Sequence, residues 1–342
     1  MHLIILSDSL PHPPLPTAMS TRIPLLLGTP AFGVKGPKAT ARINTIKEAQ
    51  DIVDLLVSYG QKGLDTSRCY GNGSSEEFIG QLDLKGAFVD TGAYPFNPGD
   101  FGPEKLRESV ELSVKALGPH KIHTFFLQGP ERATPIEVTL RTINELYKEG
   151  HFEEFGVSNY FAWEVAEMVA IAEKNNWIRP TVYQGLYNAI ERRVEDELFP
   201  CLRHFGIRFN VYSPLASGVL TGKFPTETEM RSVTGTRWDP KISEFATSLH
   251  SKYGPLLPVV RELKDVLDKH DIRITEAAQR WLQHHSQLRP ECGDMVVIGA
   301  SNIKQVEANL KESTGGPLPE DALGLLEKAW SQAKGLAPHY AF

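Results

Sequence analysis

The sequence predicts an α/β protein folded as a (β/α)8 TIM barrel, and two observations support this fold class. Eight short apolar segments each precede one or two amphipathic helical segments, and most connections between them are only a few residues long. Strict alternation of strands and helices requires a parallel sheet, and eight such units close into a barrel. The 342 residues suit a single barrel domain spanning residues 21–342.

A doubly wound open sheet is the alternative fold with the same alternation. It requires a glycine-rich fingerprint between the first strand and its helix, with an acidic residue about 20 positions further on. The candidate glycines, in Gly71-Asn72-Gly73, follow the second strand and lack that context. We therefore expect a loop at these residues and favour the barrel.

The first four units are marked by helical periodicity and by residues that begin or end helices. Apolar residues recur at helical spacing over 46–57. Ser74 or Ser75 is suited to cap the second helix, and Gly150 ends the fourth. The predicted strand and helix of each unit are 23–27 and 46–59, 63–66 and 76–82, 87–89 and 104–117, and 122–127 and 136–148.

The last four units follow the same rule with one irregularity. Gly206 ends the helix before the seventh strand, and a long polar loop separates that strand from two helices. A final helix, 321–333, has no strand after it. The predicted strand and helix of each unit are 154–157 and 163–174, 181–184 and 195–204, 208–212 with 256–269 and 275–284, and 295–298 and 303–312.

Composition excludes several classes of partner and site. The formal net charge of −6 provides no basic field for nucleic acid or anionic lipid, and no apolar run approaches the ~18 residues of a membrane span. The three cysteines are far apart, so a disulfide framework is not expected. These features predict a cytoplasmic protein that acts on a small-molecule substrate.

The first 20 residues are set apart from the barrel. The apolar run 3–6 is too short for the core of a signal peptide. The proline-rich stretch 11–16 predicts an extended chain. Met19 directly precedes the first strand. Two interpretations stay open: residues 1–18 lie upstream of a native start at Met19, or they form a disordered tail.

In a barrel, catalytic groups lie where strands end and loops begin. The residues at these positions include one carboxylate without a second to pair with it, which argues against glycosidase chemistry. They include no cluster with metal-ligand spacing. The set consists of Asp65, Tyr70, Gly92, Gln128, Ser158, Asn159, Gln184, Tyr212, Ser213 and Gly299–Ser301.

Several of these residues stand in motifs of a known family. The stretch Leu64-Asp65-Thr66-Ser67-Arg68-Cys69-Tyr70-Gly71 resembles the active-site signature of the aldo-keto reductases. Gly156-Val157-Ser158-Asn159-Tyr160 and Tyr212-Ser213-Pro214-Leu215 match further motifs. The stretches 163–167 and 198–206 are most similar to the aflatoxin-aldehyde-reductase branch. The resemblance covers about residues 23–340 and implies a barrel that binds NADP(H) and reduces aldehydes or ketones.

The resemblance also implies positions for the cofactor. Residues that would hold the nicotinamide amide are Ser158, Asn159 and Gln184, with Tyr212 stacked on its ring. Residues on the loop that would cover the pyrophosphate are Ser213, Leu215, Ser217 and Lys223. Residues that would clamp the 2′-phosphoadenosine are Gly299, Ala300, Ser301, Gln305 and Asn309, next to a helix N-terminus that favours phosphate.

The catalytic tetrad of the family is only half present. Asp65 and Tyr70 match its Asp and Tyr, whereas Gly92 stands where the family has Lys and Gln128 where it has His. Without the lysine, the pKa of Tyr70 should stay near ~10 or rise with burial. Gln128 can still donate a hydrogen bond to a carbonyl. Arg68 either supplies the missing charge or points to the surface.

Three hypotheses for the activity follow from this mixture. In the first, the protein is an NADP(H)-dependent carbonyl reductase in which Tyr70 donates the proton and Gln128 orients the substrate. In the second, Asp65 or Tyr70 acts as acid or base in a dehydration, isomerisation or cyclisation without net redox change. In the third, it is a non-catalytic nucleotide-binding partner protein. The terminal residues Tyr340-Ala341-Phe342 lack the arginine that the branch associates with acidic substrates, so an anionic aldehyde is not expected. Aromatic residues such as Trp238 and Tyr94 suit an apolar substrate, and the unusual tetrad favours a role in specialised metabolism. Members of the family form monomers and dimers, so the resemblance implies a monomer or homodimer.

Overall fold

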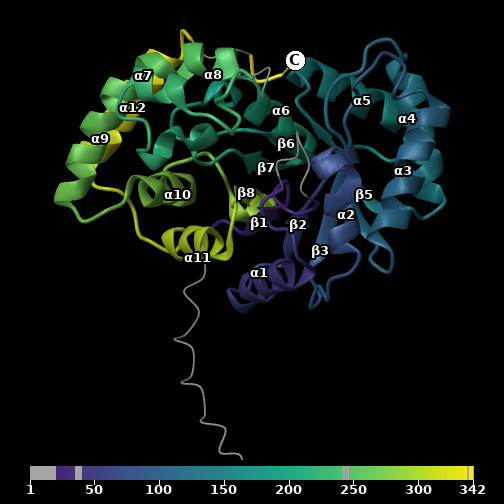
Figure 1. Ribbon diagram of the computed structural model, residues 1–342. Coiled ribbons are helices and arrows are strands. Elements are labelled where there is room, and N and C mark those ends of the chain that lie inside the picture. Colours follow the sequence, from purple (N-terminus) through teal and green to yellow (C-terminus); the bar gives the residue numbers. More distant parts are fainter. Residues whose placement is uncertain (1–20, 35–40, 242, 244–245, 337–338, 342) are drawn as a thin grey trace, which may run out of the picture.

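The computed structural model describes residues 21–34, 41–241, 243, 246–336 and 339–341 (Figure 1). Eight parallel strands close into a barrel in the order β1 to β8, which confirms the predicted fold class. The strands are β1 Leu25–Gly28, β2 Gly63–Asp65, β3 Phe88–Ala93, β4 Ile122–Leu127, β5 Phe152–Ser158, β6 Val182–Leu186, β7 Arg208–Tyr212 and β8 Met295–Gly299. The extension predicted at residues 1–20 lies outside the described residues.

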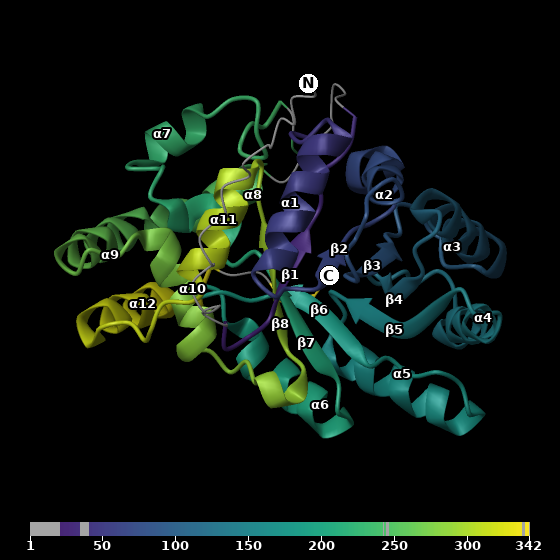
Figure 2. The ribbon, with the colours of Figure 1, turned by 90° about the horizontal axis from the view of Figure 1, so that it is seen from below.

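Helices surround the strands on all sides, as the view from below shows (Figure 2). The final helix, which has no strand after it, packs against α9. The helices are α1 Ile46–Ser58, α2 Ser74–Ile79, α3 Pro103–Leu117, α4 Ile136–Lys148, α5 Ala162–Asn175, α6 Leu198–Phe205, α7 Glu227–Ser232, α8 Ala246–Tyr253, α9 Leu257–Lys269, α10 Ile274–His284, α11 Ile303–Glu312 and α12 Glu320–Ala333.

The barrel closes through the pairing of its first and last strands. Leu25 to Gly28 of β1 pair in register with Val296 to Gly299 of β8. Apolar side chains from strands and helices form one continuous buried core, which is the expected result when the helices bury one apolar face each against the sheet. The carboxyl ends of all eight strands therefore share one rim of the barrel.

Several elements differ from those predicted. α2 begins at Ser74 with Gly73, rather than a serine, at its N-cap, and β6 extends to Leu186, so that Gln184 lies within the strand. β3 extends to Ala93, four residues beyond the predicted strand, because Thr91, Gly92 and Ala93 pair with Phe125 to Leu127 of β4 despite their weak apolar pattern. The long polar loop after β7 contains α7 and α8. Among the described residues, no helix is both long and apolar enough to cross a membrane.

Candidate active site

The rim at the carboxyl ends of the strands brings the predicted polar residues together. Asp65, Ser158 and Tyr212 are the last residues of β2, β5 and β7, and Gln128 follows β4 directly. The Nε2 group of Gln184, in β6, donates a hydrogen bond to Asp65 Oδ1 at 2.7 Å across the barrel. Because this bond joins strands separated by 119 positions in sequence, it can form only once the barrel is closed.

Asp65 is a buried carboxyl group without a cationic partner among the described residues. It is 2% exposed, and its one side-chain hydrogen bond comes from the neutral amide of Gln184. The pKa of Asp65 is raised to about 7, mainly because the carboxyl is buried; the Gln184 hydrogen bond lowers it and the negative charge of Asp90 raises it. The carboxyl therefore changes its protonation state near neutral pH.

Tyr70 begins a tight turn at the end of the signature segment. The turn Tyr70–Gly73 is a 3-10 segment in which Gly71, Asn72 and Gly73 all have positive φ, a backbone that favours glycine and asparagine. Desolvation raises the pKa of Tyr70 well above its ordinary value, and the negative charge of Asp65 raises it further. Arg237 is the cation that opposes this shift. The phenol is therefore a weak acid that stays protonated.

Gly92 has no room for the side chain that the family places there. A Cβ atom on Gly92 would lie 2.4 Å from the backbone oxygen of Phe126 and 3.1 Å from Gln128 Cγ. The register between β3 and β4 shifts between Val89 and Thr91, just before this point. A lysine at position 92 would require the two strands to move apart, so the two departures from the tetrad lie in one packing region.

Gln128 is held in one orientation by the signature segment. Ser67 Oγ donates to Gln128 Oε1 at 2.6 Å, while the backbone N–H of Cys69 donates to the same hydroxyl at 3.3 Å. The Asn159 side chain donates to the Gln128 backbone oxygen at 2.9 Å. Gln128 Nε2 makes no hydrogen bond within the described chain, so both of its N–H groups remain free to donate.

Arg68 is engaged by Glu76 and does not replace the missing lysine. Its Nη1 lies 2.7 Å from Glu76 Oε2, and its guanidinium occupies the space where a Cβ on Gly73 would stand. Glu76 is fully buried and also accepts a hydrogen bond from Thr91 Oγ1 at 2.6 Å. Burial raises the pKa of Glu76, against the charge of Arg68. The Arg68–Glu76 pair thus ties the Tyr70 turn to α2 and β3.

The predicted nicotinamide residues form a second hydrogen-bonded group. Tyr212 Oη donates to Asn159 Oδ1 at 2.8 Å, and Asn159 Nδ2 donates to Ser158 Oγ at 3.0 Å. Asn159 has a φ of 66°, in the left-handed region that asparagine tolerates. On the loop that follows, Trp238 Nε1 donates to the backbone oxygen of Ser217 at 3.2 Å.

The predicted adenosine clamp lies at the start of α11. Asn302 caps this helix by accepting the N–H of Gln305 at 3.0 Å, and Gln305 Oε1 accepts the N–H of Ser301 at 2.8 Å. Asn309 Nδ2 donates to the backbone oxygen of Gly299 at 3.1 Å. Lys304, in the first turn, is exposed and makes no ion pair within the described residues.

These donors fit the nucleotide that the sequence predicts. Lys223 is exposed on the predicted pyrophosphate loop, and the first turn of α11 adds backbone N–H groups and Lys304, which suit phosphate. Sequence reasoning did not identify the roles of Ser67, Glu76 and Trp238. Ser67 lies inside the recognised signature, but its contact with Gln128 spans 61 positions, so no local pattern could reveal it.

Comparison with known proteins identifies the family to which the chain belongs. A model of the aldo/keto reductase family matches residues 24–331. An aldo-keto reductase from Pseudocercospora fijiensis is 40% identical over 298 residues, which cover 85% of this chain and 100% of that protein. The aflatoxin B1 aldehyde reductase member 2 of Mus musculus is 36% identical over 343 residues, covering 96% and 91%. Oxidoreductase sirO of Leptosphaeria maculans is 37% identical over 300 residues, covering 87% and 90%. The chain therefore belongs to the aldo/keto reductase family, in the branch that contains the aflatoxin aldehyde reductases.

Proposed function

We propose that the protein is an NADP(H)-dependent carbonyl reductase in which Tyr70 gives the proton and Gln128 orients the substrate. The observation that carries this proposal is the fixed amide of Gln128. Its Oε1 is occupied by Ser67 at 2.6 Å, which leaves Nε2 as a donor to a carbonyl oxygen. In the family tetrad a neutral imidazole fills this role, and an amide N–H can do the same.

The bound nicotinamide would supply the hydride, and the residues of this chain would supply the rest. Ser158, Asn159 and Gln184 would hold the carboxamide, and Tyr212 would stack on the ring. Gln128 Nε2 would hydrogen-bond the carbonyl oxygen, where negative charge develops. Tyr70 Oη would give its proton to that oxygen, so that the alcohol forms without a charged intermediate being released.

The electrostatics of the site predict which substrates are reduced. Because the pKa of Tyr70 is raised, the phenol is a poorer acid than one beside a lysine, and general acid catalysis is weakened. Reactive carbonyls, above all aldehydes, depend least on such an acid. Tyr94 and the exposed Phe96 form an edge-to-face pair with centroids 5.1 Å apart, which supports a small apolar aldehyde.

The pH dependence follows from Asp65. Its pKa of about 7 means that it is neutral below this pH and anionic above it. The anion raises the pKa of Tyr70, so protonating Asp65 makes Tyr70 a better proton donor. We expect kcat for aldehyde reduction to rise as the pH falls through about 7, and Asp65→Asn to remove this rise.

The proposal is tested by mixing the purified protein with NADPH and a panel of apolar aldehydes and following NADPH absorbance. Tyr70→Phe should lower kcat by about 10²–10⁴-fold and leave NADPH binding unchanged. Tyr147→Phe, on the exposed side of α4, is the matched control and should match the wild type. NADPH binding without turnover of any aldehyde would contradict the proposal.

A second candidate is acid–base chemistry without net redox change. The observation that favours it is the carboxyl of Asp65, whose pKa of about 7 suits a general acid or base. In this case a dehydration, isomerisation or cyclisation would proceed without nucleotide turnover and would be lost in Asp65→Asn. If the protein binds NADPH but converts no substrate by either route, the interpretation as a non-catalytic partner protein replaces both.

A further inference from the structure

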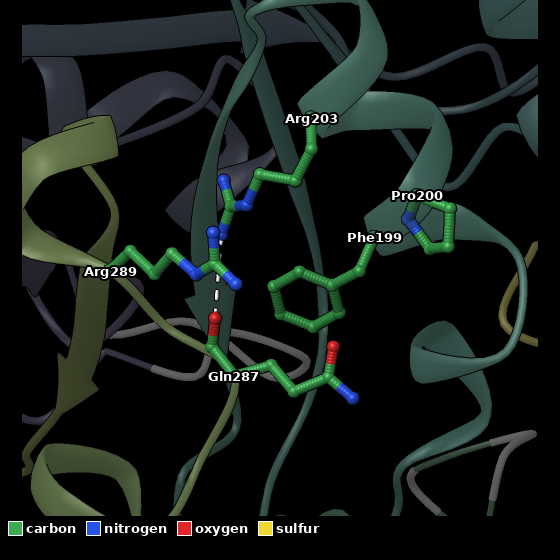
Figure 3. A pocket seen from close by; sticks show the side chains of 5 residues that line it. All are labelled: Phe199, Pro200, Arg203, Gln287 and Arg289. Carbon is green, nitrogen blue, oxygen red and sulfur yellow. Dashed lines mark hydrogen bonds between the residues drawn. The ribbon is translucent and has the colours of Figure 1, made fainter.

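A surface pocket lies at the end of the barrel opposite the candidate active site. It has a volume of about 190 Å³, and the residues that line it are Phe199, Pro200, Arg203, Gln287 and Arg289 (Figure 3). Arg203 lies near the end of α6, before β7, and residues 287 and 289 precede β8. Because these segments lead into the amino ends of β7 and β8, the pocket shares no residue with the nucleotide-binding rim.

Asp294 is the acidic group at this pocket, and its acceptor positions are already used. It is fully buried and forms a two-point ion pair with Arg203, in which Nη1 donates to Oδ1 at 2.9 Å and Nη2 donates to Oδ2. The backbone N–H groups of Phe209 and Arg289 donate to the same carboxylate at 2.9 and 2.7 Å. Each oxygen therefore accepts two hydrogen bonds.

Arg289 is left with an unmatched positive charge beside a second arginine. Its guanidinium makes no hydrogen bond or ion pair with any residue that the structure describes, and Figure 3 shows it pointing into the pocket below the Arg203 guanidinium. The side-chain amide of Gln287 also has no partner within the described residues. One saturated carboxylate and two guanidinium groups leave a net charge of +1 in a protein whose net charge is −6.

The opposite wall of the pocket is apolar. The Arg203 guanidinium lies over the Phe199 ring, 5.2 Å from the ring centroid. Pro200 extends this apolar wall. A guanidinium fork matches a carboxylate with two parallel hydrogen bonds, and the ring and proline suit an apolar body attached to it. The pocket volume of about 190 Å³ suits a compact molecule.

We propose that this pocket is a binding site for a small organic carboxylate, with the carboxylate on Arg289 and Gln287 and the apolar body against Phe199 and Pro200. The proposal is independent of the activity proposed above. An inorganic anion would use the charges but not the apolar wall, and a neutral analogue would use the wall but not the charges. Both therefore bind less well than the organic acid.

The test is a fluorine NMR titration with 4-fluorobenzoate as the probe, its neutral analogue 4-fluorobenzamide, and sulfate as a competitor. We expect 4-fluorobenzoate to bind with a Kd of about 1 mM or lower at low salt. The benzamide should bind at least about fivefold more weakly, and about 0.5 M salt should weaken benzoate binding because it screens exposed charges. Sulfate should displace the probe only at higher concentration.

Arg289→Gln identifies the site, because it removes the unmatched charge and leaves the Arg203–Asp294 pair intact. It should lower benzoate affinity at least about fivefold, with unchanged thermal unfolding and unchanged NADPH binding. Arg261→Gln, at an exposed arginine of α9, is the matched control and should leave the affinity as it is. Benzoate affinity that is equal in wild type and Arg289→Gln, or equal for benzoate and benzamide, overturns the proposal.

Discussion

The two halves of the barrel rim are stabilised by different kinds of contact. In the half formed by β5 to β8, neutral groups pair with one another, as Tyr212 does with Asn159 at 2.8 Å and Asn309 with the Gly299 backbone at 3.1 Å. In the half formed by β2 to β4, Asp65 and Glu76 are buried carboxyls whose pKa values burial raises. The second half therefore holds electrostatic strain, at the place where we propose that the proton is delivered.

The two halves of the rim also differ in how closely their residues follow the motifs that the resemblance implies. The residues that we propose for the nucleotide lie in the neutral half. The positions to which the resemblance assigns Lys and His lie in the strained half, where Gly92 and Gln128 occupy one packing region. Functional sites commonly sacrifice stability for chemistry, so substitutions that relieve the strain should stabilise the protein.

The largest expected effect is that of Asp65→Asn on stability. The carboxyl has a pKa of 3.8 when unfolded and about 7 when folded, so keeping it ionised in the folded protein costs up to about 4 kcal/mol. The folded protein binds more protons than the unfolded chain between these values, so this contribution to stability falls as pH rises from about 4 to about 7 and is constant above. At about pH 8, Asp65→Asn should raise the free energy of unfolding by up to about 4 kcal/mol, and this gain should shrink as the pH falls.

Urea denaturation of wild type and Asp65→Asn over this pH range measures the effect. Asp265→Asn, at an exposed position of α9, is the matched control and should leave both the stability and its pH dependence unchanged. A stability difference between wild type and Asp65→Asn that does not vary with pH would show that Asp65 is ionised in the folded protein throughout.

The next effect is expected for the Arg68–Glu76 pair. Arg68→Met leaves Glu76 as a buried carboxyl without its cation, and breaking such a pair costs about 3 kcal/mol. The double variant Arg68→Met with Glu76→Gln removes both charges and should recover most of the lost stability. Lys311→Met, which breaks the exposed Lys311–Glu307 pair of α11 at 2.6 Å, should cost less than about 0.5 kcal/mol. Urea denaturation measures the free energy of unfolding of each variant. A double variant as unstable as Arg68→Met would contradict the prediction.

Local patterns made the fold predictable, whereas the contacts of the strained half depend on long-range packing. The strand–helix alternation and the positions of Asp65 and Gln128 at strand ends follow from periodicity and from the barrel rule. The engagement of Arg68 by Glu76 depends on Gly73, which has no Cβ and so leaves room for the guanidinium. The crowding at Gly92 depends on the β3–β4 register, and neither is encoded in a short stretch of sequence.

A smaller effect is expected where the two halves differ in crowding. Gly92→Ala would place a Cβ 2.4 Å from a backbone oxygen, and overpacking of this kind costs about 1–3 kcal/mol. Gly299→Ala, at the corresponding end of β8, meets nothing within 4 Å and should change stability by less than about 0.5 kcal/mol. Thermal unfolding of the two variants provides the comparison. Equal stability of both would mean that β3 and β4 can separate, and a lysine at position 92 would then be tolerated.

A smaller loss of stability again is expected for Ser67→Ala, and its comparison with Ser158→Ala tests whether the two halves of the rim have separate functions. Loss of the 2.6 Å hydrogen bond to Gln128 costs about 1 kcal/mol and frees the amide to rotate, so kcat should fall while the Kd for NADPH stays unchanged. Ser158→Ala costs less stability, because Asn159 Nδ2 keeps the Gln128 backbone oxygen as an acceptor at 2.9 Å, but it should raise the Kd for NADPH. Fluorescence titration with NADPH and steady-state kinetics of both variants measure the contrast. If Ser67→Ala weakened NADPH binding and left kcat intact, Gln128 would belong to the nucleotide site and the division of the rim into two halves would be wrong.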